Sequence, residues 1–163
     1  TTGEELLSLC IVLKESFFYD KSEIYTSSMS TKCNEIIKSG AFSLKKAEVN
    51  LANYERYQGK TDFHGYYTVQ NNMGFWDTKL LSNVTFLEPL SVFNSPPDNM
   101  HLVLFRNRML YYNPTIQNKV LGNIYKSLSP EGFLIVGAKE NLAKTSYSER
   151  FKIINESERI YKK

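Results

Sequence analysis

The sequence predicts one domain of the α/β class. Short strands of apolar residues alternate with amphipathic helices along the chain, and the last two strand-like segments read as an antiparallel hairpin. A length of 163 residues suits one compact domain with a substantial core. The composition, 42% apolar and 23% charged, is that of a globular protein, which excludes disordered, collagen-like and coiled-coil classes.

The first third of the chain predicts the order helix, strand, helix. In the first helix, apolar residues recur at helical spacing, two glutamates occupy the first turn, and Thr1 or Thr2 is the expected cap. Ser30 caps the second helix, and Gly40 suits the position just after it. The predicted elements are a helix over residues 3–14, a strand over 23–27 and a helix over 31–40.

The middle of the chain predicts an insertion. A short helix is expected over Ala47–Tyr57, followed by a small hairpin in an aromatic region between Phe63 and Trp76 that three glycines interrupt. Aromatic rings from Tyr54 to Trp76 would suit stacking on nucleic-acid bases if a basic groove accompanied them. We favour packing of these rings in the core and the insertion.

The second half predicts a parallel strand pair and a closing hairpin. Met100–Phe105 is almost continuously apolar, which is typical of a central strand buried on both faces. Asn113 and Pro114 begin a helix that ends before Pro130. The segments expected after it are a turn over residues 130–132, a buried strand over 133–136, and a hairpin of 151–155 with 159–162.

The charge, the hydropathy, the cysteines and the histidines indicate which partners, which metal sites and which cellular compartment to expect. A net charge of +3 is dispersed along the chain, so no nucleic-acid partner is predicted. No apolar stretch is long enough to cross a bilayer, and we expect no membrane insertion. Cys10 and Cys33 are expected to be buried thiols in a reducing, cytoplasmic setting. His64 and His101 lack metal-ligand spacing, so no metal is predicted.

Three segments together resemble the chemotaxis receptor methyltransferase (CheR) family. The first is Thr2-Gly3-Glu4-Glu5 at the start of a helix. The second is the strand end Leu104–Pro114, in which an Arg-Asn pair is followed by apolar residues and tyrosines. The third is the turn and strand Leu128–Gly137 with the following Glu140-Asn141-Leu142. Their order and spacing extend the resemblance over essentially the whole chain.

The resemblance implies a Rossmann-like class I methyltransferase sheet that binds S-adenosylmethionine and releases S-adenosylhomocysteine. Open α/β sheets bind ligands at the carboxyl ends of their strands. The family methylates a glutamate side chain of a chemoreceptor, so a chemoreceptor or another signalling protein is the expected acceptor. The family's first strand lies upstream of the position of Thr2, which implies a sheet with its first strand missing.

The family's functional roles carry over to six positions. Thr2 closes the cofactor loop, Glu5 holds the ammonium of the methionine part, and Arg106 and Asn107 line the cofactor pocket. Tyr111 faces the transferring methyl and serves as the catalytic residue. Two simpler alternatives stay open: Glu5 favours the helix N-terminus through its charge, and Tyr111 is an ordinary half-buried ring.

Ser28, the sixth position, departs from the family pattern, which has an acidic residue there for the ribose hydroxyls. The segment near the adenine and the acidic residue before the Arg-Asn strand also differ, as Pro89-Leu90-Ser91 and His101. A second interpretation is therefore a degenerate, non-catalytic module that acts in binding or regulation. Without the first strand, exposed sheet edges favour a homo-oligomer.

Overall fold

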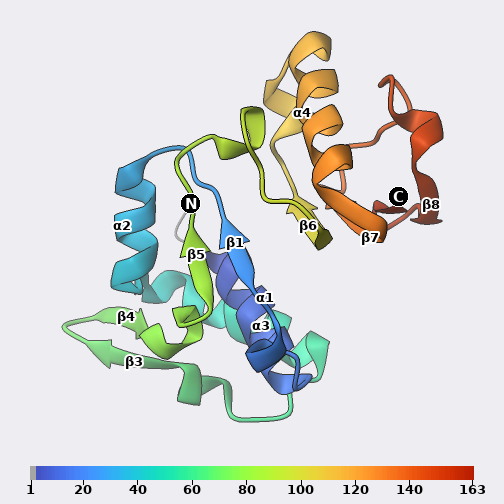
Figure 1. Cartoon of the computed structure of the whole chain (residues 1–163). Helices are drawn as coiled ribbons and strands as arrows, with labels where there is room; N and C mark the ends of the chain where they lie inside the picture. The colour runs from blue at the N-terminus through green and yellow to red at the C-terminus, as the bar shows by residue number, and fades with distance from the viewer. Residues whose placement is uncertain (1–2) are drawn as a thin grey trace. The chain divides into compact units, whose positions relative to one another are not determined.

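The structure is a computed structural model that describes residues 3–163, and the chain divides after Pro89 into two compact units (Figure 1). Both units combine helices with sheets, and each contains one parallel strand pair. The α/β class is therefore confirmed. That the two units belong to one domain stays a prediction.

The first unit contains a pair of parallel strands and two helices that the sequence predicts. Ser30 accepts a hydrogen bond from the Cys33 N–H at 3.3 Å, and Gly40 ends the second helix at φ 69°. β1 pairs with β5, a three-residue strand that the sequence analysis did not identify. These elements are α1 (Glu4–Glu15), β1 (Ile24–Thr26), α2 (Thr31–Ser39) and β5 (Val84–Phe86).

The cap of α1 differs from the prediction. Gly3 is the N-cap, with φ 79° and no side-chain hydrogen bond, whereas Thr1 and Thr2 lie outside the described residues. A Cβ on Gly3 would lie 3.0 Å from the Ile37 side chain of α2. The left-handed backbone and this close approach together require glycine here.

The predicted insertion forms a three-stranded antiparallel sheet beside α3 (Ala47–Tyr57). The expected hairpin is β3 (Tyr67–Gln70) with β4 (Met73–Trp76), and β2 (Ala41–Ser43) adds a third strand on the other side of β4. Asn71 and Asn72 both have positive φ, which matches the twist of a two-residue hairpin turn. The hairpin is confirmed, and β2 was not predicted.

The core of the first unit is built from α1, the insertion and the segment before β5. Its rings pack against one another: Trp76 stacks on Phe42 at 4.6 Å between centroids and meets Phe63 at 5.8 Å. These aromatic side chains are buried, as core packing predicts. Burial raises the pKa of Cys10 to about 12, while Cys33 is only half-buried, contrary to the expectation of two buried thiols.

The second unit is one four-stranded sheet with a helix. The strand order is β6-β7-β9-β8, in which β6 and β7 are parallel and the last two strands form the predicted antiparallel hairpin. The Asn113 side chain caps the helix by accepting from the Ile116 N–H at 3.0 Å. The elements are β6 (Met100–Phe105), α4 (Pro114–Ser127), β7 (Leu128–Val136), β8 (Lys152–Asn155) and β9 (Ile160–Lys162).

Two details of this sheet correct the sequence analysis. β6 is not buried on both faces along its whole length: the adjacent residues His101 and Leu102, whose side chains point to opposite faces, are both exposed, Leu102 to 41%. Residues 130–132 do not precede the next strand but lie within β7. The register of β7 on β6 shifts there, and Glu131 has φ 69°, so the expected turn is a bulge.

Each parallel pair has an open edge. Within residues 3–163, β1 pairs only with β5, and β6 pairs only with β7. Each of these two sheets therefore ends in a strand whose outer backbone groups have no strand partner among the described residues. Among the described residues no helix has both the length and the apolar character needed to span a membrane.

Candidate functional site

The loop after β6 carries two of the predicted cofactor-binding residues. Phe105 ends the strand as a buried side chain, and Arg106 and Asn107 directly after it are exposed. Asn107 has φ 57°, a left-handed conformation that asparagine adopts more readily than most residues. A Cβ on Gly137, at the end of β7, would lie 2.3 Å from the Asn107 Oδ1, so the loop packs closely on the neighbouring strand end.

A buried carboxylate holds this loop in place. Glu140, 3% exposed, accepts backbone hydrogen bonds from Met109 at 2.6 Å, Gly137 at 2.7 Å, Asn107 at 2.8 Å and Leu110 at 3.3 Å. One carboxylate oxygen binds Asn107 and Gly137, and the other binds Met109 and Leu110. An ionised carboxylate that accepts several N–H groups makes strong, charge-assisted hydrogen bonds. Glu140 therefore fixes the backbone of the loop that contains Arg106 and Asn107.

Tyr111 lies at the end of a 3₁₀ turn formed by Met109–Tyr111 and is 84% exposed. The alternative of a half-buried ring is therefore wrong for Tyr111. The neighbouring Tyr112 is the half-buried ring, and it packs against Phe93 with 5.5 Å between the ring centroids. At this exposure the Tyr111 ring is accessible to a ligand.

Two predicted residues lie in the first unit. Glu5 is exposed in the first turn of α1, where its charge also favours the helix dipole. Ser28 follows β1, is 6% exposed, and donates its hydroxyl hydrogen to the Ser30 carbonyl at 2.7 Å. Ser28 can therefore offer a ligand only an acceptor lone pair. Thr2 lies outside the described residues.

The structure thus brings together Arg106, Asn107 and Tyr111 on one loop and its following turn, within the second unit. It adds Glu140, which the sequence analysis quoted as part of a motif without giving it a role. The segment Glu140-Asn141-Leu142, shortly after a predicted strand, was the available signal. Burial of the charge could not be inferred from that pattern alone.

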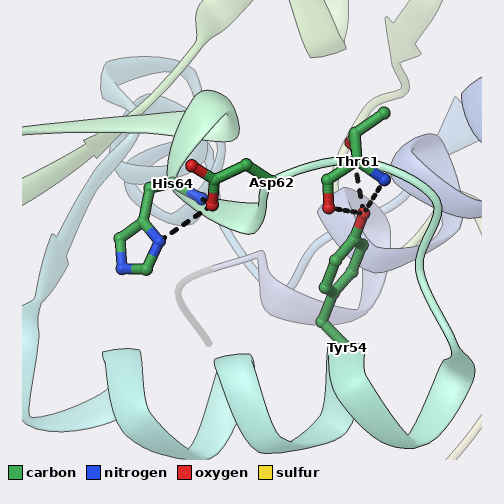
Figure 2. A network of polar contacts seen from close by, with 4 residues as sticks. All are labelled: Tyr54, Thr61, Asp62 and His64. Carbon is green, nitrogen blue, oxygen red and sulfur yellow. Dashed lines mark hydrogen bonds and ion pairs between the residues drawn. The ribbon is translucent and has the colours of Figure 1, made fainter.

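A second buried carboxylate, Glu15, organises the first unit. It accepts from the Tyr66 hydroxyl at 2.9 Å, the Lys60 N–H at 3.0 Å and the Thr61 hydroxyl at 3.2 Å, and it also contacts Tyr54. Figure 2 shows Tyr54 reaching Thr61, whose N–H donates to the Tyr54 hydroxyl at 3.0 Å. All these groups tie the segment after α3 to the end of α1, which indicates a structural role.

The same segment carries a surface pair, and no metal site accompanies it. Asp62 accepts from the His64 N–H and lies 3.0 Å from its ring Nδ1, as Figure 2 shows. These hydrogen bonds lower the pKa of Asp62. Over residues 3–163 there is no group of three or more histidine, cysteine, aspartate or glutamate side chains arranged to hold a metal ion.

Comparison with known proteins places this arrangement in a family. The family model described as the SAM-binding domain of CheR methyltransferases matches residues 1–160. A Pseudomonas putida protein named Cher3, assigned as a methyltransferase, is 32% identical over 163 residues, all of this chain and 60% of its own length. A chemotaxis protein methyltransferase of Salmonella typhimurium is 26% identical over 148 residues, 88% of this chain.

The chain therefore spans about 60% of the length of the Pseudomonas relative and 50% of the Salmonella relative. Among solved structures, a protein of Nostoc punctiforme assigned as an O-methyltransferase aligns with 82% of this chain and 30% of its own, at a TM-score of 0.49 and 16% identity.

Proposed function

Because the chain belongs to the family of CheR methyltransferase SAM-binding domains, we propose that it transfers a methyl group from S-adenosylmethionine to a glutamate side chain of a chemoreceptor or another signalling protein in the cytoplasm. S-adenosylmethionine is the cofactor of this family. The observation that carries the proposal is the loop after β6, which Glu140 holds rigidly while Arg106, Asn107 and Tyr111 stay exposed.

The chemistry asks little of the protein beyond alignment. The bound cofactor supplies an electrophilic methyl group on a positively charged sulfur. A glutamate is already ionised near neutral pH, so its oxygen needs no general base to act as the nucleophile. The protein's task is to hold the acceptor oxygen in line with the methyl group, and such positioning can supply much of the rate enhancement.

The residues that match the family's cofactor positions are assigned the following roles in the proposal. In the proposal, the Glu5 carboxylate holds the ammonium of the methionine part, and Arg106 and Asn107 line the pocket at the end of β6. The family resemblance gives Thr2, which lies outside the described residues, a role in the cofactor loop. Ser28 suits a ribose hydroxyl only in part, because its own hydrogen is already donated to the Ser30 carbonyl, so that it can accept a neutral hydrogen bond from the ribose but cannot donate one.

Tyr111 and Glu140 take different roles. Tyr111 is the proposed catalytic residue, since an exposed phenol beside the Arg106 loop can contact the reacting methyl and the acceptor carboxylate. Glu140 is a positioning residue, because among the described residues its buried oxygens accept hydrogen bonds from four backbone N–H groups. Loss of Tyr111 is expected to lower kcat, whereas loss of Glu140 should disturb cofactor binding through the loop.

The state of Ser28 supports a second candidate function, a module that binds the cofactor or a signalling partner without catalysing transfer. A carboxylate accepts two charge-assisted hydrogen bonds from ribose, and a serine accepts one neutral bond. The difference costs about 1.5 to 3 kcal/mol, or roughly tenfold to a hundredfold in affinity. Such a loss weakens the cofactor site while leaving the fold intact.

A methyl-transfer assay distinguishes the two candidate functions. The chain is incubated with methyl-labelled S-adenosylmethionine and a chemoreceptor cytoplasmic fragment, beside a fragment whose methyl-accepting glutamates are replaced by alanine. Base-labile label on the glutamate fragment alone, lost in Tyr111→Ala, supports the transferase. Label on neither fragment, although S-adenosylhomocysteine binds, supports the non-catalytic module.

A further inference from the structure

The turn that ends α1 carries two adjacent phenylalanines that face solvent. Phe17 is 81% exposed and Phe18 is 58% exposed. Both lie in the first unit, between α1 and the short 3₁₀ turn Tyr19–Lys21. Single apolar residues are common on protein surfaces, whereas two neighbouring large rings at this exposure form a small apolar patch. We refer to these two residues as the Phe17–Phe18 patch.

The backbone of Phe17 has a conformation that suits glycine better than phenylalanine. The Phe17 N–H donates to the Lys14 carbonyl at 3.1 Å, and the Phe18 N–H donates to the Leu13 carbonyl at 2.9 Å. These two hydrogen bonds form the Schellman ending of a helix, in which the residue at the position of Phe17 is left-handed and is usually glycine. Phe17 has φ 60°, which is unfavourable for a large side chain.

The Phe17 ring contributes little to the fold. Hydrophobic stabilisation is proportional to the apolar area that is buried, and this ring buries little area. The Lys60 ammonium lies 5.6 Å from the ring centroid, but a cation–π contact at an exposed site is weak. A residue that strains the backbone without packing in the core indicates a role outside the fold.

The charges beside the patch indicate what it contacts. Lys14, Lys21 and Lys60 are exposed. Asp20 is the one exposed acidic residue of the segment 14–22. Lysine is depleted in the interfaces between proteins, and the dominant side chains there are tryptophan, tyrosine and arginine. Phenylalanine together with lysine is instead typical of surfaces that lie on anionic lipid.

We propose that the Phe17–Phe18 patch docks the protein on the surface of an anionic lipid bilayer. The two rings enter the boundary between head groups and acyl chains, and Lys14, Lys21 and Lys60 contact the acidic head groups. Such contact places the protein on the bilayer without crossing it. The patch lies wholly within the first unit, and the proposal does not depend on methyl transfer.

Co-sedimentation with vesicles tests the proposal. The 163-residue chain is mixed with vesicles of equimolar phosphatidylcholine and phosphatidylserine, and separately with vesicles of phosphatidylcholine alone. The wild type should bind the mixed vesicles about tenfold or more tightly than the neutral ones, because the acidic head groups attract the lysines. This binding should weaken as the salt concentration rises.

The Phe17→Gly variant separates docking from folding. Glycine is favoured at this left-handed position, so the urea midpoint should equal or exceed that of the wild type. Binding to the mixed vesicles should weaken about tenfold, because one apolar ring is lost. Ile153→Ser removes an apolar side chain that is 57% exposed in the second unit, and this matched control should bind as the wild type does.

Four results would overturn the proposal. They are no binding of the wild type to the mixed vesicles, equal binding by Phe17→Gly, a lowered urea midpoint for Phe17→Gly, and Phe17-dependent binding to a chemoreceptor cytoplasmic fragment in place of vesicles. The third result would show that the ring belongs to the fold, and the fourth would assign the patch to a protein partner.

Discussion

Removing the Glu140 carboxylate should destabilise the loop that carries Arg106 and Asn107. In Glu140→Ala, four backbone N–H groups lose their acceptor, two of which belong to the buried residues Met109 and Gly137. At about 1 to 3 kcal/mol for each buried donor left unsatisfied, and allowing for water to reach the outer groups, the expected loss of stability is about 3 to 5 kcal/mol.

Glu140→Gln tests the geometry more sharply. Each carboxylate oxygen accepts from two N–H groups, so whichever way the amide turns, its NH₂ faces two donors. The glutamine variant should therefore lose about 2 to 4 kcal/mol, although it matches glutamate in size. Glu149→Gln, an exposed glutamate in the same unit, is the control and should stay within about 0.5 kcal/mol of the wild type.

The assay combines urea denaturation followed by circular dichroism with amide hydrogen exchange. Denaturation gives the loss of stability, and exchange at Asn107, Met109 and Gly137 locates it. Both Glu140 variants should exchange faster at these amides than the wild type. A Glu140→Gln protein with unchanged protection and an unchanged urea midpoint would refute the idea that this carboxylate holds the loop.

Three further outcomes are expected. Burial alone would raise the pKa of Glu15, but hydrogen bonds from Tyr54, the Lys60 N–H and Tyr66 hold that pKa below its ordinary value of 4.5. The stability that these hydrogen bonds contribute is therefore present above pH 4.5 and is lost as the pH falls through the lowered pKa. Urea midpoints between pH 3 and 7 should therefore fall on the acid side in the wild type and change less in Glu15→Gln, and parallel curves would contradict this. Gly74→Ala should cost about 1 to 3 kcal/mol in thermal or urea denaturation, because its Cβ would lie 2.3 Å from the buried Phe42 ring, and an unchanged midpoint would show that the ring can move. The open edges of β1 and β6 should favour self-association, seen as a mass above 18.9 kDa in light scattering, and a strictly monomeric mass at all concentrations would refute it.

Local signals predicted the local elements well. Ser30 and Gly40 cap the two ends of α2, and Asn113 caps α4. The helix over Ala47–Tyr57 begins and ends at the residues that the sequence indicated. In each case the capping residue or the helical spacing of apolar residues lies within the element itself. Such elements can be predicted without knowledge of tertiary contacts.

The elements that sequence analysis missed depend on distant partners. β5 and β2 have three residues each, too few to show a period, and each exists because another strand pairs with it. The bulge in β7 arises where the register on β6 shifts, although residues 130–132 read locally as a turn. Short strands and bulges are decided by pairing, which a single sequence does not display.

The candidate site likewise contains residues that the sequence identified and residues whose role depends on tertiary contacts. The resemblance identified Arg106, Asn107 and Tyr111, and their exposure suits a binding role. The support beneath them, Glu140 with its four N–H donors, could be found only once the fold brought the ends of β6 and β7 together. The Ser28 hydroxyl is a parallel case, because its bond to Ser30 depends on the conformation of the segment after β1.

The central claim, a cofactor site that includes Arg106 and Asn107, is tested most directly by calorimetric titration with S-adenosylhomocysteine. The wild type should bind, and Arg106→Ala and Asn107→Ala should each weaken binding about tenfold to a hundredfold, since each removes a polar contact to the cofactor. Lys119→Ala, an exposed cation of α4, should bind as the wild type does. No binding by the wild type, or equal binding by all four proteins, would contradict the claim.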